Sequence, residues 1–117
     1  MLLTGFEFCE DINPAKGAIR YTMQRGMFYV VTATVEPDGI SAFNHIPGIP
    51  YLESITVEFD WQGYGLGTQM MQHILSKHPR IYLDCAEDNE TAKALYRKMG
   101  FRKTDMVHKD LHTWIKE

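Results

Sequence analysis

The sequence of 117 residues is poor in cysteine and holds only Cys9 and Cys85. Two cysteines are too few for the disulfide framework that stabilises many small secreted proteins. The sequence also lacks an apolar run of about 18 residues, the length that a membrane-spanning helix requires, and nothing at its start resembles a signal peptide. These absences predict a cytoplasmic protein with reduced thiols and without a membrane span.

A surplus of positive charge is also absent, since 12 Lys and Arg residues stand against 15 Asp and Glu residues, for a formal net charge of −3. Binding along the phosphate backbone of a nucleic acid needs clustered Lys and Arg side chains. The nearest such cluster lies between Arg97 and Lys103, and it is small enough to be the solvated end of a helix. Nucleic acid is therefore not expected as the main partner.

The length and composition are those of one ordinary globular domain. A chain of 117 residues can bury one modest core, and 44% of the residues are hydrophobic. No internal repeat, low-complexity tract or linker interrupts the sequence. We therefore expect a single domain over residues 1–117.

Strand patterns dominate the first half of the sequence. Residues 13–24 are the exception, because Asn13 followed by Pro14 is typical of a helix start. β-branched and aromatic residues cluster after Met27, and the turn over 36–39 has proline and glycine where a tight turn favours them. We therefore expect one short helix over 13–24 and strands at 2–9, 27–35, 40–45 and 51–57.

The second half alternates between helix and strand patterns. Apolar residues recur at helical spacing over 66–77, and Pro79 ends that run. They recur again from Ala92 to Met99, where Asp88 or Asn89 opens a helix and Gly100 closes it. Strands are expected at 81–85, 101–104 and 112–115. This order of elements is that of an α/β or α+β domain.

The most informative motif is a glycine-rich turn between an expected strand and an expected helix, Gln62-Gly63-Tyr64-Gly65-Leu66-Gly67. Glycine reaches positive φ without strain and lets another molecule approach the backbone closely. The N–H groups of such a turn and the positive end of the next helix together form an anion site. A phosphate or pyrophosphate group is therefore expected there.

Two familiar phosphate-binding loops do not fit this turn. The P-loop ends in Gly-Lys followed by Ser or Thr, whereas Gly67 is followed by Thr68. The dinucleotide-binding fingerprint needs a third glycine where this sequence has Met70 or Thr68, depending on the starting glycine. What remains is the pattern Gln-x-x-Gly-x-Gly between a strand and a helix.

The run 52–57, followed by Gln62-x-x-Gly65-x-Gly67, resembles the acetyl-CoA-binding motif of the GNAT family of N-acetyltransferases. Downstream, the pattern Asn89-x-x-Ala92-x-x-Leu95-Tyr96-x-x-x-Gly100-Phe101 resembles the second signature of that family. The resemblance is close over 51–101, moderate over 102–117, and weak before residue 51, where only the order of elements fits.

The resemblance implies a mixed, mostly antiparallel sheet flanked by helices. In such a fold the strand ending at Val57 and the strand over 80–85 splay apart to form the acetyl-CoA cleft. The stretch between the first two strands is shorter than usual in the family, so the acceptor pocket would be open or completed by a second subunit. A homodimer through the C-terminal strands would cover Trp114 and Ile115, which we expect to be exposed in a monomer.

The resemblance also assigns roles in cofactor binding. Backbone groups of Ile55, Thr56 and Val57 would pair with the pantetheine arm of acetyl-CoA like an extra strand. Asn89 would hydrogen-bond the pantetheine, and Tyr96 would lie near the thioester sulfur and serve as the acid; the alternatives are a plain helix cap and a plain core residue. The pyrophosphate would be held by the amides of Gln62, Gly63, Tyr64, Gly65, Leu66, Gly67 and Thr68. No role falls to a metal.

Glu53 is the candidate general base. The acceptor amine must lose a proton before it attacks, because an ammonium group with a pKa of about 10 is not nucleophilic. On strand alternation Glu53, Ile55 and Val57 share one face, and a carboxylate in line with two aliphatic side chains is not typical of a random surface charge. Several members of the family that the sequence resembles carry a glutamate at this place. The alternative is a salt-bridged edge residue.

The expected function is transfer of an acetyl group from acetyl-CoA to a primary amine by direct attack. The amine belongs to a small molecule or to a protein, and the sequence leaves that choice open. Asp84, Glu87 and Asp88 either form an acidic patch that attracts a cationic amine or are loop and helix-start charges. The alternative function is a non-catalytic acyl-CoA-binding regulatory module, which would need neither Glu53 nor Tyr96.

Overall fold

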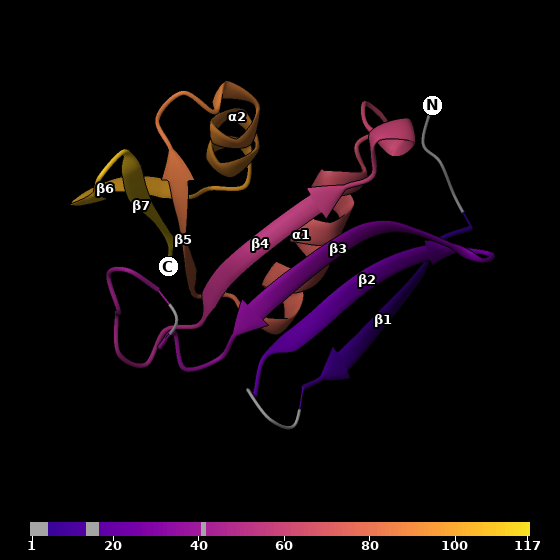
Figure 1. Cartoon of the computed structure of the whole chain (residues 1–117), viewed down its shortest axis with the longest axis horizontal. Helices are drawn as coiled ribbons and strands as arrows, with labels where there is room; N and C mark the ends of the chain where they lie inside the picture. The colour runs from indigo at the N-terminus through magenta and orange to yellow at the C-terminus, as the bar shows by residue number, and fades with distance from the viewer. Residues whose placement is uncertain (1–4, 14–16, 41) are drawn as a thin grey trace.

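The computed structural model describes residues 5–13, 17–40 and 42–117. Its strands form one mixed sheet in the order β1-β2-β3-β4-β5-β7-β6 (Figure 1). Two α-helices, α1 (Leu66–Lys77) and α2 (Glu90–Lys98), and a short 3-10 helix, η1 (Phe59–Trp61), accompany it. The strands are β1 (Glu7–Ile12), β2 (Ile19–Arg25), β3 (Phe28–Glu36), β4 (Tyr51–Val57), β5 (Ile81–Ala86), β6 (Arg102–His108) and β7 (Leu111–Lys116).

β4 and β5 are parallel, whereas every other neighbouring pair of the described strands is antiparallel. The parallel pair meets at Tyr51 and Tyr82, where the Tyr82 N–H donates to the Pro50 carbonyl at 3.0 Å. Beyond that contact the two strands diverge toward Val57 and Ala86, as Figure 1 shows. The predicted mostly antiparallel sheet with splayed central strands is therefore confirmed.

The core lies between one face of β2 to β4 and α1, and it continues under α2. Helix α1 buries one stripe of side chains against β2, β3 and β4: Leu66, Met70, Met71 and Ile74. The opposite face of β1 to β4 carries no helix among the described residues (Figure 1). That half of the sheet is therefore apolar on one face and polar on the other, as antiparallel sheets commonly are.

The predicted helix over 13–24 is wrong, because this segment contains β2, while residues 14–16 lie outside the described residues. Ile19, Tyr21 and Met23 alternate toward the core, so the period is that of a strand. The Gly17 N–H donates to the Asn13 carbonyl at 2.7 Å, which belongs to the turn that joins β1 to β2. Pairing with strands on both sides thus overrides the local helix-start signal. The predicted first strand, 2–9, is displaced to β1, and residues 1–4 lie outside the described residues.

The predicted strand over 40–45 is also wrong, because the described residues of this segment form a loop. The Ile40 N–H donates to Asp38 Oδ1 at 3.0 Å, so the aspartate side chain takes the hydrogen bond that a strand partner would provide. The Tyr82 hydroxyl donates to the Gly39 carbonyl and accepts from the Ile46 N–H, both at 3.1 Å. The loop is thus held to β5 by side chains.

The other predicted elements are confirmed. The bounds 51–57 and 66–77 are those of β4 and α1, and β5, α2, β6 and β7 lie where strands and a helix were expected. Trp114 and Ile115 are 2% and 6% exposed, so the expectation that they are exposed in a monomer is wrong. They are covered by their own chain, which removes the reason for a dimer through these strands.

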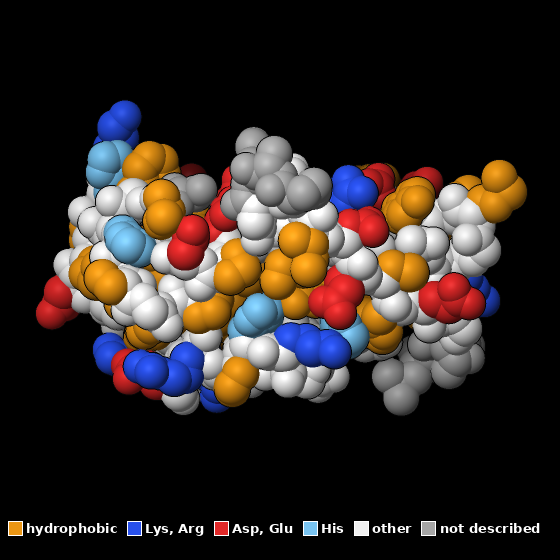
Figure 2. All heavy atoms as spheres, turned by 90° about the horizontal axis from the view of Figure 1, so that it is seen from below, with side chains coloured by type: hydrophobic (Ala, Val, Ile, Leu, Met, Phe, Trp, Pro, Cys, Tyr) orange, Lys and Arg blue, Asp and Glu red, His pale blue; other side chains and the backbone are white. Residues whose placement is uncertain are grey.

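The surface seen from below carries acidic, basic and hydrophobic side chains interspersed with one another (Figure 2). A mixed surface of this kind is usual for globular proteins. Among the described residues, no helix is long and apolar enough to span a membrane.

We expect Gly39→Ala to destabilise the protein more than Gly48→Ala does. Both glycines have positive φ, +68° and +81°, so alanine strains the backbone at either position. At Gly39 a Cβ would also lie 2.7 Å from the Tyr82 hydroxyl oxygen, whereas at Gly48 it would meet nothing within 4 Å. The additional loss of unfolding free energy should be about 1–3 kcal/mol, measured by chemical denaturation. Equal losses would show that the contact with Tyr82 does not hold this loop.

Candidate active site

A cavity of about 550 Å³ opens where β4 and β5 diverge. Its walls come from the end of β4, the glycine-rich turn, the start of α1 and one side of α2. Most residues that the sequence proposed for cofactor binding line it: Ile55, Thr56, Val57, Gln62, Gly63, Gly65, Leu66, Gly67, Thr68, Asn89 and Tyr96. Segments separated by more than thirty residues in the sequence thus meet at one cavity.

The edge of β4 forms one wall of the cavity. Its other edge pairs with β3, for example Ile55 with Ala33 and Val57 with Val31. No described strand pairs with β4 on the cavity side beyond Tyr51. Backbone N–H and C=O groups on that edge can therefore bind an extended chain of amide groups in the manner of an added strand.

The glycine-rich turn leads into α1 through two left-handed residues. Gly63 and Gly65 have φ of +85° and +77°, which only glycine adopts without strain, and Gly65 is the N-cap of α1. The Gln62 Nε2 donates to the Val57 carbonyl at 3.1 Å and fastens the turn to the end of β4. The first turn of α1 contains no acidic residue. Its first N–H groups and the positive end of the helix dipole are therefore suited to an anion, and Leu66, Gly67 and Thr68 line the cavity.

Asn89 begins α2 and serves as its cap. Its Oδ1 accepts a hydrogen bond from the Ala92 N–H at 3.1 Å, so Asn89 does cap the helix, as its alternative role from the sequence predicts. The same residue lines the cavity. Capping occupies the oxygen of the amide, and the Nδ2 group remains the donor that this side chain can offer to a bound molecule.

Tyr96 lies on the face of α2 that is turned to the core, and it is 8% exposed. Its ring packs against Phe101 and Trp114, with centroid distances of 5.7 and 6.4 Å. Burial, with a smaller contribution from Cys85, raises the pKa of Tyr96 to about 12. The phenol is therefore neutral at physiological pH and can donate a hydrogen bond, but it cannot act as a base.

Glu53 does not share the face of Ile55 and Val57, so the prediction from strand alternation is wrong at this position. Thr34 pairs with Ser54 and the next residue of β3, Val35, pairs with Leu52, which leaves Glu53 as the extra residue of a β-bulge. Leu52 takes the buried place in line with Ile55. The bulge turns Glu53, which is exposed, toward a different cavity.

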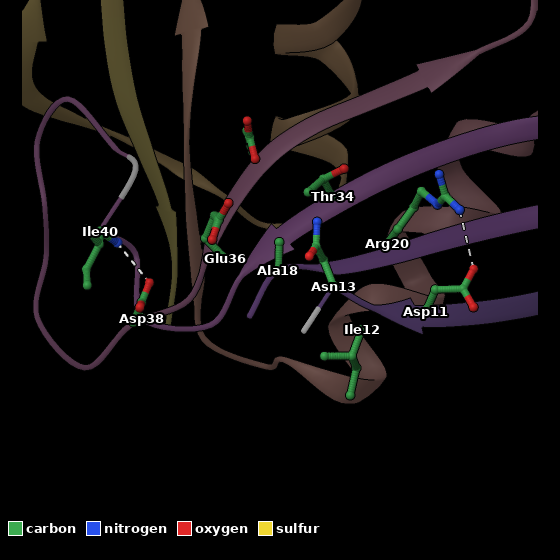
Figure 3. Close-up of a pocket in the computed structure, with 10 residues that line it drawn as sticks. Asp11, Ile12, Asn13, Ala18, Arg20, Thr34, Glu36, Asp38 and Ile40 are labelled. Atoms are coloured by element: carbon green, nitrogen blue, oxygen red, sulfur yellow. Dashed lines mark hydrogen bonds and ion pairs between the residues drawn. The ribbon is translucent and has the colours of Figure 1, made fainter. Parts of the chain in front are cut away.

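This second cavity, of about 770 Å³, lies on the face of β1 to β4 that carries no helix within the described part of the chain. Figure 3 shows its floor, where Arg20 on β2 and Thr34 and Glu36 on β3 project from neighbouring strands. Glu53 of β4 and the residues at the start of the loop after β3 complete it. The two catalytic candidates thus lie in different cavities, Tyr96 in the first and Glu53 in the second.

Other candidates lie elsewhere. Tyr64, proposed for cofactor binding, lines a smaller neighbouring cavity with Arg25 and is half exposed. In the expected acidic patch, Asp84 accepts from the hydroxyls of Tyr51 and Thr113, at 3.0 and 2.6 Å. Glu87 pairs with Lys93 and Lys103. Of the three residues of this expected patch, Asp84 and Glu87 therefore make contacts within the protein that stabilise the fold. Among the residues that the structure describes, no group of His, Cys, Asp and Glu is arranged to hold a metal ion.

Two further residues line the first cavity, Trp61 and Thr91. Trp61 is expected from the sequence either to line an acceptor pocket or to pack in the core, and it directly precedes the glycine-rich turn. No role was expected for Thr91, and its position two residues after Asn89 is the signal that could have identified it.

Comparison of sequences finds relatives among bacterial acetyltransferases. The chain is 32% identical over 71 residues to the N-alpha-acetyltransferase RimI of Mycobacterium tuberculosis, which is 58% of this chain and 45% of that protein. It is 32% identical over 54 residues to the peptidyl-lysine N-acetyltransferase YjaB of Escherichia coli, which is 46% of this chain and 37% of that protein. The chain thus spans less than half the length of these curated relatives.

Comparison of structures finds the same fold in other proteins. A GNAT family acetyltransferase from Elizabethkingia anophelis with acetyl-CoA bound superposes with a TM-score of 0.77 over 98% of this chain and 99% of that one, at 12% identity. A Bacillus subtilis acetyltransferase in complex with CoA gives a TM-score of 0.71 over 96% and 97%, at 15% identity. The model of the acetyltransferase (GNAT) domain family matches residues 24–103, which is more than half of the sequence. This chain therefore belongs to the GNAT family.

Proposed function

We propose that this protein transfers an acetyl group from acetyl-CoA to a primary amine. The observation that carries the proposal is the cavity between the diverging strands β4 and β5. In proteins of the same fold, the structures from Elizabethkingia anophelis and Bacillus subtilis contain acetyl-CoA or CoA. The sequence relatives named for N-acetyltransferase activity support the reaction type.

The cavity suits the chemistry of acetyl-CoA in three respects. The open edge of β4 from Ile55 to Val57 offers backbone groups to the amides of pantetheine. The start of α1, without acidic side chains, suits the negative charge of a pyrophosphate. Asn89 offers an amide donor from the opposite wall. The residues present therefore fit the cofactor.

Acetyl-CoA supplies an activated acetyl thioester. We propose that a backbone N–H on the open edge of β4 stabilises the negative charge that develops on the thioester oxygen. Glu53, exposed at the bulge, takes the proton of the acceptor ammonium group through a water molecule.

Tyr96 has a narrower role than that of a full acid. A phenol with a pKa of about 12 is a much weaker acid than a thiol, whose ordinary pKa is about 8.5. Complete transfer of the Tyr96 proton to the departing thiolate is therefore unfavourable. We propose that Tyr96 donates a hydrogen bond to the thiolate, which leaves without first being protonated.

The acceptor is a primary amine of a small molecule or of a protein. YjaB is named as acting on peptidyl lysine and RimI on an α-amino group, so the relatives span both kinds of protein amine. We propose the cytoplasm as the place of action, in keeping with two cysteines that are both free thiols.

We expect Glu53→Gln to lower kcat/KM by about 100-fold without changing the affinity for acetyl-CoA. Tyr96→Phe should lower kcat by about tenfold, because it removes one hydrogen bond and no proton transfer. Thiol release from acetyl-CoA measures kcat and kcat/KM, and calorimetry measures the affinity for acetyl-CoA. Glu58→Gln, which removes an exposed carboxylate outside both cavities, is the matched control. Unchanged turnover in both variants would remove Glu53 and Tyr96 from the mechanism, whereas no turnover by the native protein, with acetyl-CoA still bound, would favour the non-catalytic regulatory module.

We expect Gly67→Ala to change stability and cofactor affinity in opposite directions. Within α1 alanine is favoured over glycine by up to about 1 kcal/mol, and a Cβ at Gly67 would make ordinary contacts, 3.6 Å from Val57 and 3.8 Å from Leu95. The methyl group would also stand at the start of α1 where the pyrophosphate should approach, so the Kd for acetyl-CoA should rise by about tenfold. Denaturation and calorimetry measure the two effects. A more stable variant with unchanged affinity would contradict the assignment of the pyrophosphate site.

A further inference from the structure

A third cavity, of about 430 Å³, adjoins the cavity proposed for acetyl-CoA. Trp61 lines both of them. Tyr64 lines the third cavity, whereas the glycines on either side of it, Gly63 and Gly65, line the first. The glycine-rich turn thus contributes its glycines to one cavity and its tyrosine to the other. A ligand whose pyrophosphate lies at this turn therefore has the third cavity within reach of its far end.

The walls of the third cavity are largely aromatic. Phe28 at the start of β3 is 66% exposed, Tyr64 is 49% exposed, and Trp61 is half-buried. Large apolar side chains that gather at an exposed recess commonly mark a binding site, whereas single exposed ones do not. Aromatic side chains suit a flat, conjugated ring in particular, because such rings stack on one another.

One cation and one carboxylate accompany these rings, Arg25 and Asp60. The guanidinium carbon of Arg25 lies 5.6 Å from the ring centre of Phe6 and 5.8 Å from that of Trp61. Cation–π contacts of this kind hold the side chain in place and leave guanidinium N–H groups as donors to an anion. Within the described part of the chain, no carboxylate forms an ion pair with Arg25.

Asp60 sets a further condition on the ligand. A carboxylate accepts hydrogen bonds and repels an anion that comes close to it. The third cavity therefore does not suit a bare phosphate. It suits a ligand that joins a flat ring and an amino group to an anionic group, so that each part meets a different wall.

We propose that the third cavity binds the nucleotide end of acetyl-CoA, with the adenine ring against Tyr64 and Phe28 and the ribose phosphate at Arg25. This inference rests on the proposed function. Adenine is a flat ring with an amino group, and in CoA a ribose that carries a phosphate joins it to the pyrophosphate. The aromatic walls meet the ring, Asp60 accepts from the amino group, and Arg25 donates to the phosphate. The ring of Tyr64 thus binds the cofactor in addition to the backbone of the turn.

The test compares ligands that share the acetylated pantetheine and differ in the nucleotide. Calorimetry measures the Kd of acetyl-CoA, of acetyl-dephospho-CoA, which lacks only the ribose phosphate, and of S-acetyl-phosphopantetheine, which ends before the nucleotide. We expect S-acetyl-phosphopantetheine to bind about tenfold more weakly than acetyl-CoA. Adenosine bisphosphate, the nucleotide end alone, should change the fluorescence of Trp61, which is the more exposed of the two tryptophans.

Tyr64→Ala tests the stacking contact. Alanine removes an exposed ring and leaves the neighbouring glycines in place, so the fold should tolerate it. We expect the Kd of acetyl-CoA to rise by about tenfold and that of S-acetyl-phosphopantetheine to stay unchanged. Tyr29→Ala, which removes another exposed tyrosine ring and lies outside all three cavities, is the matched control.

Arg25→Gln tests the phosphate contact. In the native protein acetyl-CoA should bind about fivefold more tightly than acetyl-dephospho-CoA, and in Arg25→Gln the two should bind equally well. Because Arg25 also packs on Phe6 and Trp61, Arg25→Lys serves as a second variant. Lysine keeps the charge, so the preference for acetyl-CoA should remain.

The outcomes separate the two proposals. If Tyr64→Ala weakens the binding of both ligands equally, or of neither, the nucleotide does not lie in the third cavity, and the acetyltransferase proposal stands. A preference for the ribose phosphate that survives in Arg25→Gln would overturn the role of Arg25. If the native protein binds neither acetyl-CoA nor S-acetyl-phosphopantetheine, the proposed function fails, and this inference with it. Selective weakening of acetyl-CoA binding by Tyr64→Ala would support the third cavity as the nucleotide site.

Discussion

The site depends on the limited pairing between β4 and β5. Two parallel strands joined at Tyr51 and Tyr82 and free beyond them leave a wedge in the middle of the sheet. The crossover between them passes through α1, which is the usual way to connect parallel neighbours. The geometry brings the open edge of β4 and the start of α1 to the same side of the wedge, and α2 closes the other side. A fully paired sheet would have used the hydrogen-bonding groups that the wedge offers to a ligand.

Local sequence patterns were sufficient to predict the structure of a segment where its own residues determine its conformation. The helical period of 66–77, the cap at Asn89 and the strand pattern of 51–57 were all read from neighbouring residues. Local patterns failed where pairing with another strand determines the conformation. β2 is a strand because β1 and β3 pair with it on both sides, although Asn13 and the residue after it favour a helix start. The bulge at Glu53 arises from the register between β3 and β4, which no spacing within β4 reveals.

The residues that line the second cavity could not be predicted from local sequence patterns either. The cofactor motifs are short and continuous, so the residues that line the first cavity could largely be predicted. Asp11, Glu36 and Glu53 are far apart in the sequence and belong to three strands, and only the strand order brings them to one recess. Of the three acidic residues that the sequence singled out, Asp84 and Glu87 are instead held by hydroxyl and ammonium groups of their own surroundings.

The loop between β3 and β4 fastens the two halves of the sheet to each other. It is held to β5 through the Tyr82 hydroxyl, to β7 through a 3.3 Å hydrogen bond from Asn44 to Thr113, and to β6 through Phe43 stacked on His108 at 4.4 Å. Because it leaves β3 and enters β4, neither half can swing away without breaking these contacts. The wedge is therefore held at a set width from its closed end, and a ligand entering it would find a preorganised groove rather than having to part the strands.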